Sequence, residues 1–210
     1  MRQFDIVTVK MEAIQKVAKA AQTPTQCKTL AQLSLAIVED LWANDRYQDA
    51  VNVAAIALAA AQKTNDASLV SRSAQCAEHA KGMASAYGQL MSSLNVLQQT
   101  PADPDANLAV GRFYCLVKRD WTAGLPMLAL ANGSPWKPLA ARELAGGAPA
   151  IELADGWWEL AQREEEPAKR QFQIHAAGWY RQALSTLDAA AKARAQNRIA
   201  EAPPEPRGRL

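Results

Sequence analysis

Few residues in this chain are of a type and spacing that could do chemistry. Histidine, the commonest metal ligand and a frequent general base, occurs only twice in the 210 residues, as His79 and His175. Neither has a second histidine four residues away, so the paired histidines of a helical zinc site are absent. The cysteines Cys27, Cys76 and Cys115 lie far apart and belong to no CxxC or Cys/His cluster. We therefore expect buried core cysteines, and neither a metal site nor a disulfide framework.

The acidic residues and glycines stand where helices are expected to begin or end. Residues 164–166 are three glutamates before Pro167, at a predicted helix start where negative charge is favourable. An acid pair in catalysis needs a pocket that shifts its pKa values, and an exposed charge run provides none. Gly146 and Gly147 are typical of a helix stop. No GxSxG, GxGxxG or GxxxxGKS/T sequence occurs, so we predict a non-catalytic protein without a cofactor.

Aromatic side chains are the remaining candidates for a binding site. Those of the second half are Trp121, Trp136, Trp157, Trp158, Trp179 and Tyr180. Adjacent residues of a helix point about 100° apart, so Trp157 and Trp158 are not expected to share one core. One of these two rings must then face a neighbouring helix, a domain interface or a partner. A sugar-binding platform would need two coplanar exposed rings flanked by polar side chains.

The composition favours closely packed helices and excludes some partners. Apolar residues make up 49% of the chain and aromatic residues only 6%, and Ala and Leu supply much of the apolar content. Such a composition favours helices over sheets. A formal net charge of +2 predicts neither nucleic acid nor an anionic membrane surface as a partner. The mildly basic C-terminal stretch is interpreted as a solvated helix face followed by a tail.

The chain shows no membrane or targeting signal. No stretch approaches the ~18 unbroken apolar residues of a membrane-spanning helix. The first residues lack the apolar core of a signal peptide. As written, the chain is expected to be water-soluble and cytoplasmic, or exported if it is a fragment of a longer exported protein.

Apolar residues at alternating spacings of four and three predict ten helices and no strand. Thr23–Pro24 and Asp103–Pro104 each combine a capping side chain with proline at the first helical position. The turn at residues 44–45 is so short that the helices on either side must be antiparallel. The predicted helices cover residues 5–21, 24–43, 47–63, 66–99, 104–118, 121–131, 136–145, 149–163, 167–187 and 189–200.

Residues 66–99 are predicted to form one long central helix. Its heptad seam consists of Leu69, Ser73, Cys76, Ala80, Met83, Tyr87, Leu90, Leu94 and Leu97. The seam either packs within the chain, which its small and polar members favour, or makes a homodimeric coiled coil. The proline-rich turn at 101–105 gives the clearest boundary. We therefore divide the chain into N-terminal hairpins with the long helix (1–101), a helical-repeat half (102–201) and a proline-rich flexible tail (202–210).

The helix pair predicted over residues 104–135 carries a repeat pattern. In the first helix an apolar and a small residue, Val110 and Gly111, are followed by the aromatic Tyr114. The second helix has a small residue, Ala123, and a large one, Met127, and Pro135 closes the pair. This pattern resembles the tetratricopeptide repeat (TPR), in which small residues let two helices approach closely. Looser units cover residues 153–183 and 37–57. The resemblance implies antiparallel helix pairs in a right-handed superhelix.

A second resemblance concerns longer segments. Residues 107–121 and 124–128, together with 155–161 and 176–184, are similar to a helical region of large, uncharacterised multidomain proteins of planctomycete bacteria. In those proteins the region resembles a spacer or interaction region beside other modules. The opening residues 2–5 resemble the middle of such regions. The resemblance implies a fold and a context but transfers no activity.

We therefore expect a helical-repeat module that binds a protein or peptide or spaces neighbouring domains. The repeat spacing places Trp157 in the core and Trp158 on the inner, concave face, where the alternative is packing on a neighbouring helix. The residues expected to contact a partner on that face are Leu108, Arg112, Cys115, Asp155 and Trp158. Only Arg112 is basic at the inner positions of the best repeat, so a clamp for a C-terminal carboxylate is not supported. The alternative function is self-assembly through the 66–99 seam.

Overall fold

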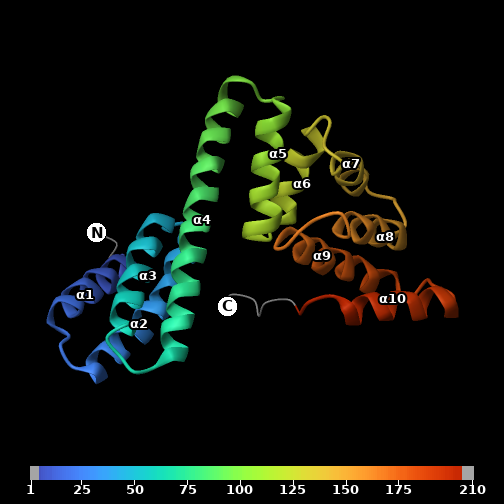
Figure 1. Ribbon diagram of the computed structural model, residues 1–210. Coiled ribbons are helices and arrows are strands. Elements are labelled where there is room, and N and C mark those ends of the chain that lie inside the picture. Colours follow the sequence, from blue (N-terminus) through green and yellow to red (C-terminus); the bar gives the residue numbers. More distant parts are fainter. Residues whose placement is uncertain (1–4, 205–210) are drawn as a thin grey trace. The chain divides into compact units, whose positions relative to one another are not determined.

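Helices make up the regular structure of this chain throughout the described range (Figure 1). The computed structural model describes residues 5–204, which contain ten α-helices, one short π-helical segment and no strand. The predicted all-α class is confirmed. By its internal contacts the chain divides into two units, unit 1 (Met1–Gly88) and unit 2 (Gln89–Leu210).

The two units share one long helix. The helices of unit 1 are α1 (Ile6–Ala20), α2 (Pro24–Ala43), α3 (Tyr47–Ala61) and the first part of α4 (Ala67–Gln99). Unit 2 contains the end of α4, then α5 (Pro104–Arg112), the π-helix η1 (Phe113–Lys118), α6 (Trp121–Leu130), α7 (Lys137–Ala145), α8 (Ala150–Ala161), α9 (Ala168–Ala183) and α10 (Ala189–Glu201).

The boundary between the units differs from the one that the sequence suggested. It falls inside α4 at Gly88, whereas the proline-rich turn after residue 101 lies within unit 2. Capping residues and prolines mark the ends of helices, so they do not reveal a change of packing partners along a continuous helix. Of the predicted tail, residues 202–204 follow α10, and residues 205–210 lie outside the described residues.

Side-chain caps explain where several helices begin. The predicted caps that accept a hydrogen bond from a backbone N–H of the first helical turn are Thr23, Asp66, Asp103, Asp120 and Asp188. Thr23 also forms a capping box with Gln26, whose side chain accepts a hydrogen bond from the Thr23 N–H. Short polar side chains therefore set these helix starts, as their sequence positions predict.

The core of unit 1 joins α1, α2, α3 and the first half of α4. Helix α3 contributes mainly alanine to it, with Ala50, Ala54 and Ala57 fully buried, so the neighbouring helices can approach closely. Leu69, Ser73 and Ala80 of the heptad seam are buried as well, and Leu69 and Ala80 belong to this core. In this part of α4 the seam packs within the chain, as we expected.

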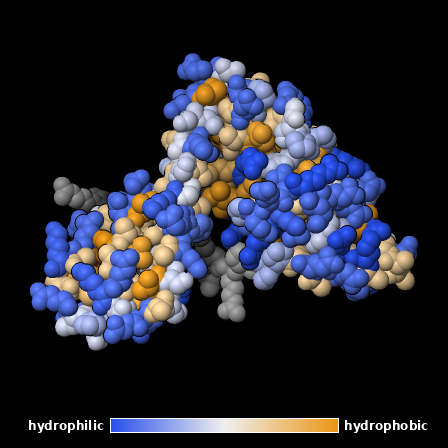
Figure 2. All heavy atoms as spheres, viewed as in Figure 1, coloured by the Kyte–Doolittle hydropathy of each residue, from blue (hydrophilic) through white to orange (hydrophobic). Residues whose placement is uncertain are grey.

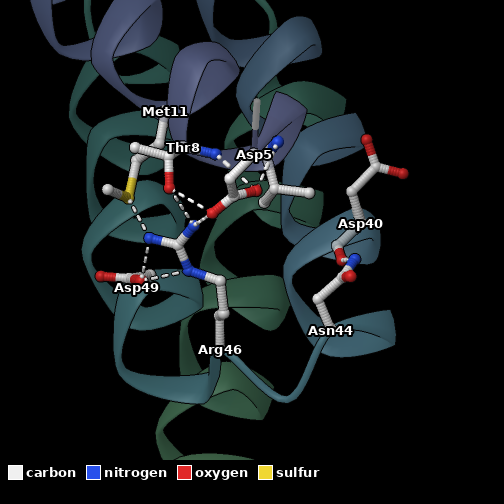
Figure 3. A network of polar contacts seen from close by, with 8 residues as sticks. Asp5, Thr8, Met11, Asp40, Asn44, Arg46 and Asp49 are labelled. Carbon is white, nitrogen blue, oxygen red and sulfur yellow. Dashed lines mark hydrogen bonds and ion pairs between the residues drawn. The ribbon is translucent and has the colours of Figure 1, made fainter. Parts of the chain in front are cut away.

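A polar network joins α1 to the start of α3 (Figure 3). The Arg46 guanidinium lies 2.7 Å from an Asp49 carboxylate oxygen, and its Nη1 donates to Asp5 at 3.0 Å and Thr8 at 2.6 Å. Hydrogen bonds from Thr8 and Val7, together with the charge of Arg46, hold the pKa of Asp5 below its usual value. One half-buried arginine thus connects two helices that are distant in sequence.

Two glycines allow α5 and α6 to pack closely in unit 2. A Cβ atom at Gly124 would overlap Cys115 Sγ and lie 3.0 Å from the Gly111 carbonyl oxygen. A Cβ atom at Gly111 would lie 2.6 Å from the Leu128 side chain. The predicted small position of the first helix, Gly111, is confirmed. The small position of the second helix is Gly124 rather than Ala123, which is half-buried.

Two helices of unit 2 differ in detail from the sequence prediction. The helix expected over residues 104–118 is α5 followed by the π-helical turn η1, and it ends at Arg119 with a left-handed φ of 59°. Helix α9 ends at Ala183 instead of continuing to Leu187, because residues 184–186 form a turn in which Thr186 N–H donates to the Ala183 carbonyl oxygen. This turn lets α10 begin in a new direction at Ala189.

Candidate interaction site

The residues expected to contact a partner all lie in unit 2, but they do not form one exposed surface. Leu108 is half-buried against the core, and Arg112 is exposed with its guanidinium 4.5 Å from the centre of the Trp136 ring. Asp155 is half-buried on α8. Cys115 is completely buried, and Trp158 is only 3% exposed. The expectation that Cys115 and Trp158 face a partner does not fit their burial.

Asp155 connects three helices through its two carboxylate oxygens. Tyr180 of α9 donates a hydrogen bond to Asp155 Oδ1 at 2.6 Å, and Arg194 of α10 lies 3.3 Å from Oδ2. The ring of Tyr180 is buried, and this burial together with the hydrogen bond to the carboxylate raises the pKa of its phenol. Asp155 therefore positions both the end of α9 and the middle of α10.

Helix α10, which contacts Asp155 through Arg194, also covers Trp158. The Arg198 guanidinium lies 4.8 Å from the centre of the Trp158 ring, within the range of a cation–π contact. Tyr180 packs against the indole with its ring centroid 6.2 Å away. The buried Trp158 Nε1 has no acceptor among the described residues. Trp158 therefore packs against neighbouring helices, which was the alternative to a position on the concave face.

A second polar cluster lies inside unit 2, and no spacing of residues along the chain indicates it. Glu143 of α7 is 8% exposed at its side chain and accepts hydrogen bonds from Trp157 Nε1 at 2.6 Å and from His175 Nε2 at 3.0 Å. The His175 ring stacks on Trp121 at a centroid distance of 3.6 Å and an interplanar angle of 7°. Helices α7, α8 and α9 therefore meet at one carboxylate, and α6 packs on the histidine that binds it.

The geometry also indicates which ring nitrogen of His175 carries a proton. A carboxylate only accepts hydrogen bonds, so His175 Nε2 must carry a proton when it bonds to Glu143. Trp179 Nε1 lies 3.3 Å from the same nitrogen, but two N–H groups cannot bond to each other. The Trp179 contact is therefore a packing contact. His175 lies at the edge of the core, with its side chain 13% exposed.

The cluster resembles the parts of an acid–base site but lacks a reactive nucleophile. The nucleophile to consider here is the Cys115 thiol. Burial, with the negative charges of Glu143 and Asp120, raises the pKa of this thiol to about 12. A catalytic cysteine requires a lowered pKa, since the thiolate is the nucleophile. The indole N–H of Trp157 and the imidazole N–H of His175 both bond to the Glu143 carboxylate, and these contacts join α8 and α9 to α7.

A shallow hollow on the surface of unit 2 has a lining separate from the residues of this cluster. It has a volume of about 260 Å³, is open to solvent and lies between α7 and α8. Pro138, Leu139, Gly156 and Leu160 form its apolar wall, and Arg142 and Arg163 are among its polar residues. Neither Glu143 nor His175 lines it. The groups that could transfer protons are therefore not among the residues that line this hollow.

Two further features bear on ligands and surroundings. Within residues 5–204 no group of three or more His, Cys, Asp and Glu side chains is arranged to hold a metal ion. Across the same range, no helix combines the length and apolar character needed to cross a bilayer.

Large apolar side chains are exposed on α1 and α2 of unit 1, namely Ile6, Val9, Val17 and Leu33. Figure 2 shows apolar residues among hydrophilic ones on this unit.

Comparison with known proteins adds no relative. No protein-family model, curated protein or solved structure matches this chain. The conclusions about function therefore depend on the geometry described above.

Proposed function

We propose that the chain is a non-catalytic helical-repeat module that binds a protein or peptide partner or spaces neighbouring domains. The observation that supports this proposal is the pairing of helices that follow one another in the chain. Helices α2 and α3, α5 and α6, and α8 and α9 pack against each other in pairs. A short connection joins α2 to α3 and α8 to α9, and η1 links α5 to α6. Stacked hairpins of this kind offer extended surfaces for binding, and a TPR-like right-handed superhelix is the arrangement that we propose for them.

The contacts and burial of the side chains that could be reactive also support a non-catalytic role. Trp157 and His175 both bond to Glu143 within the helical core, and burial raises the thiol pKa of Cys115. Two of the side chains expected to contact a partner remain accessible, Arg112 fully and Asp155 in part. These two polar residues are the proposed contacts with a partner.

The test compares how much of a partner protein is captured by the wild-type chain and by variants at these positions. The expected result is a protein that the wild-type chain retains and that R112A or D155N retains at least about tenfold less, as for contacts at the centre of an interface. D155N keeps an oxygen that can accept the Tyr180 hydrogen bond, so folding is preserved. Exposed Arg181 provides the matched control, since R181A should retain the same protein as wild type. Equal retention by all four chains would contradict the proposal.

Self-assembly through the seam of α4 is the second candidate. Met91 and Val96 lie beside the seam on the second half of α4 and are each 44% exposed, and they favour this candidate because they extend the apolar surface of the helix to solvent. Light scattering behind size exclusion, at two concentrations, separates the candidates. A mass near 22.7 kDa at both concentrations supports the monomeric module. A dimer that M91Q/V96Q abolishes would establish self-assembly instead.

A further inference from the structure

Helix α1 carries apolar residues on two sides. One side packs on α2 and α3 of unit 1 and includes the buried Ile14 (Figure 1). The other side is a stripe of exposed residues, which we call the α1 stripe: Ile6, Val9, Ala13, Val17 and Ala20. At 3.6 residues per turn these five positions fall within an arc of about 80°. A surface helix normally turns polar residues to solvent, so a continuous exposed apolar stripe indicates an interaction surface.

The packing of α1 on α2 widens this surface. The two helices are joined by the short connection at residues 21–23 and are therefore antiparallel. The ion pair of Lys10 with Asp40, at 2.6 Å, fixes their register. Seven residues after Lys10 and seven before Asp40, two turns further along the pair, stand Val17 and Leu33. Leu33 is exposed, so the apolar surface continues from α1 onto α2.

The spacing of the α1 stripe fits a second copy of itself. Its five residues are separated by three, four, four and three positions, which is the same in both directions from Ala13. If two copies of α1 pack antiparallel about Ala13, Val9 of each copy meets Val17 of the other. A two-fold contact requires such a self-complementary surface, because every residue pair in it occurs twice. The small side chain of Ala13 lets the two helices approach closely at the centre.

The charges beside the stripe fit the same arrangement. Glu12 and Lys16 are exposed on one flank of α1, and neither has an ion-pair partner among residues 5–204. In an antiparallel pair centred on Ala13, Lys16 of one copy lies level with residue 10 of the other. Glu12 of that copy is two residues further on, about 3 Å along the axis and on the same flank. The contact therefore forms the Glu12–Lys16 pair twice, which complements the apolar stripe.

We propose that the α1 stripe is a homodimer interface, on which a second copy of the chain packs its own α1 antiparallel about Ala13. This dimer goes beyond the proposed function and is compatible with it, since Arg112 and Asp155 belong to unit 2. One pair of helices buries less surface than a standard interface, so the dimer is weak and depends on concentration.

The first experiment measures the mass of the full chain by sedimentation equilibrium. Between about 5 and 500 µM, the mass should rise from 22.7 kDa towards twice this value. V9Q/V17Q should raise the dissociation constant at least about tenfold, because each valine occurs twice in the interface. Val9 and Val17 are exposed, so the monomer keeps its fold, which circular dichroism checks. The matched control is L130Q/L144Q, which changes two leucines that are as exposed as Val17 and should dimerise like wild type.

A charge exchange tests the flank. K16E places a negative charge beside Glu12 of the second copy and should weaken the dimer about fivefold at low salt. The double variant E12K/K16E restores opposite charges at both places and should dimerise like wild type. Dimerisation of the double variant as weak as that of K16E would contradict the antiparallel pairing.

Cysteine variants test the direction of the two helices. Mild oxidation should join two A13C chains by a disulfide, because residue 13 of both copies lies at the symmetry axis. In the antiparallel dimer the two copies of residue 20 are about 21 Å apart along the axis, beyond the reach of a disulfide. A20C should therefore remain monomeric on a non-reducing gel. Wild type, with its own Cys27, Cys76 and Cys115, gives the background.

The outcomes decide between this interface and the alternatives. A monomer at every concentration, a dimer that V9Q/V17Q leaves unchanged, or equal cross-linking of A20C and A13C would overturn the proposal. Loss of the dimer in M91Q/V96Q but not in V9Q/V17Q would assign the association to α4 instead. Capture of a partner protein through Arg112 is measured separately, so failure of the α1 interface leaves the proposed function standing.

Discussion

Glu143 joins α7 to α8 and α9 through buried polar contacts. Its carboxylate accepts hydrogen bonds from Trp157 Nε1 and His175 Nε2, and the His175 ring in turn stacks on Trp121. Charge-assisted hydrogen bonds of this kind are stronger than those between neutral groups. Each donor would be left without its acceptor inside the core if the carboxylate were lost.

We therefore expect E143Q to destabilise the protein by about 2–3 kcal/mol. The glutamine amide keeps the shape of the side chain, but its NH₂ group must face one of the two N–H donors. Urea unfolding followed by circular dichroism measures the effect. E165Q removes an exposed charge from the connection between α8 and α9 and should change the unfolding free energy by less than about 0.5 kcal/mol. A similarly small change for E143Q would show that the cluster adds no net stability.

At the scale of elements, the close packing of α5 with α6 depends on the absence of side-chain atoms. The space beside Gly124 is filled by Cys115 and by the backbone at Gly111, and the space beside Gly111 by Leu128. Backbone atoms cannot rotate away as a flexible side chain can. The pair would have to separate to admit even one methyl group, and a well-packed core resists such a change.

G124A should accordingly destabilise the protein by about 1–3 kcal/mol, although alanine favours helix formation over glycine. G178A in α9 is the matched control, because a Cβ atom there meets nothing within 4 Å. That change should leave the stability equal or raise it by up to about 1 kcal/mol. Thermal and urea unfolding of both variants would test this contrast. A stabilised G124A would mean that α5 and α6 pack less closely than described.

At the scale of the whole molecule, two buried groups link folding to alkaline pH. Burial and the nearby negative charges raise the pKa of the Cys115 thiol to about 12, and burial with the Asp155 hydrogen bond raises the pKa of the Tyr180 phenol. The unfolded chain releases these protons at the lower, ordinary pKa values of 9.0 for a thiol and 10.0 for a phenol. Between the unfolded and folded pKa values the native state therefore binds more protons than the unfolded state.

The stabilisation is complete below about pH 9 and is lost as the pH rises towards the folded pKa values. Each group should lower the unfolding free energy by up to about 1.4 kcal/mol per pH unit in this window. Y180F is less stable at neutral pH because it lacks the hydrogen bond to Asp155. Its unfolding free energy should fall less steeply above pH 10, while Y114F should follow wild type. Parallel curves for Y180F and wild type would contradict the linkage.

The sequence by itself determined the fold class and most helix boundaries. Thr23, Asp103 and Asp120 cap helices because their side chains bond to backbone atoms two or three residues away. Helix α2 begins and ends at the predicted residues, Pro24 and Ala43. Such signals depend only on local chemistry, and therefore a single sequence contains them. The early end of α9 at Ala183 was missed, since no proline or glycine marks it.

Only the tertiary structure decided which side chains meet and which remain exposed. Glu143 and His175 are 32 residues apart and come from different helices, so neither spacing nor residue type reveals their contact. The repeat pattern correctly placed Trp157 in the core. It could not show that α10 covers Trp158, because that burial depends on the direction in which the chain leaves α9. Long-range packing sets the site, whereas local hydrogen bonding and apolar periodicity set the helices.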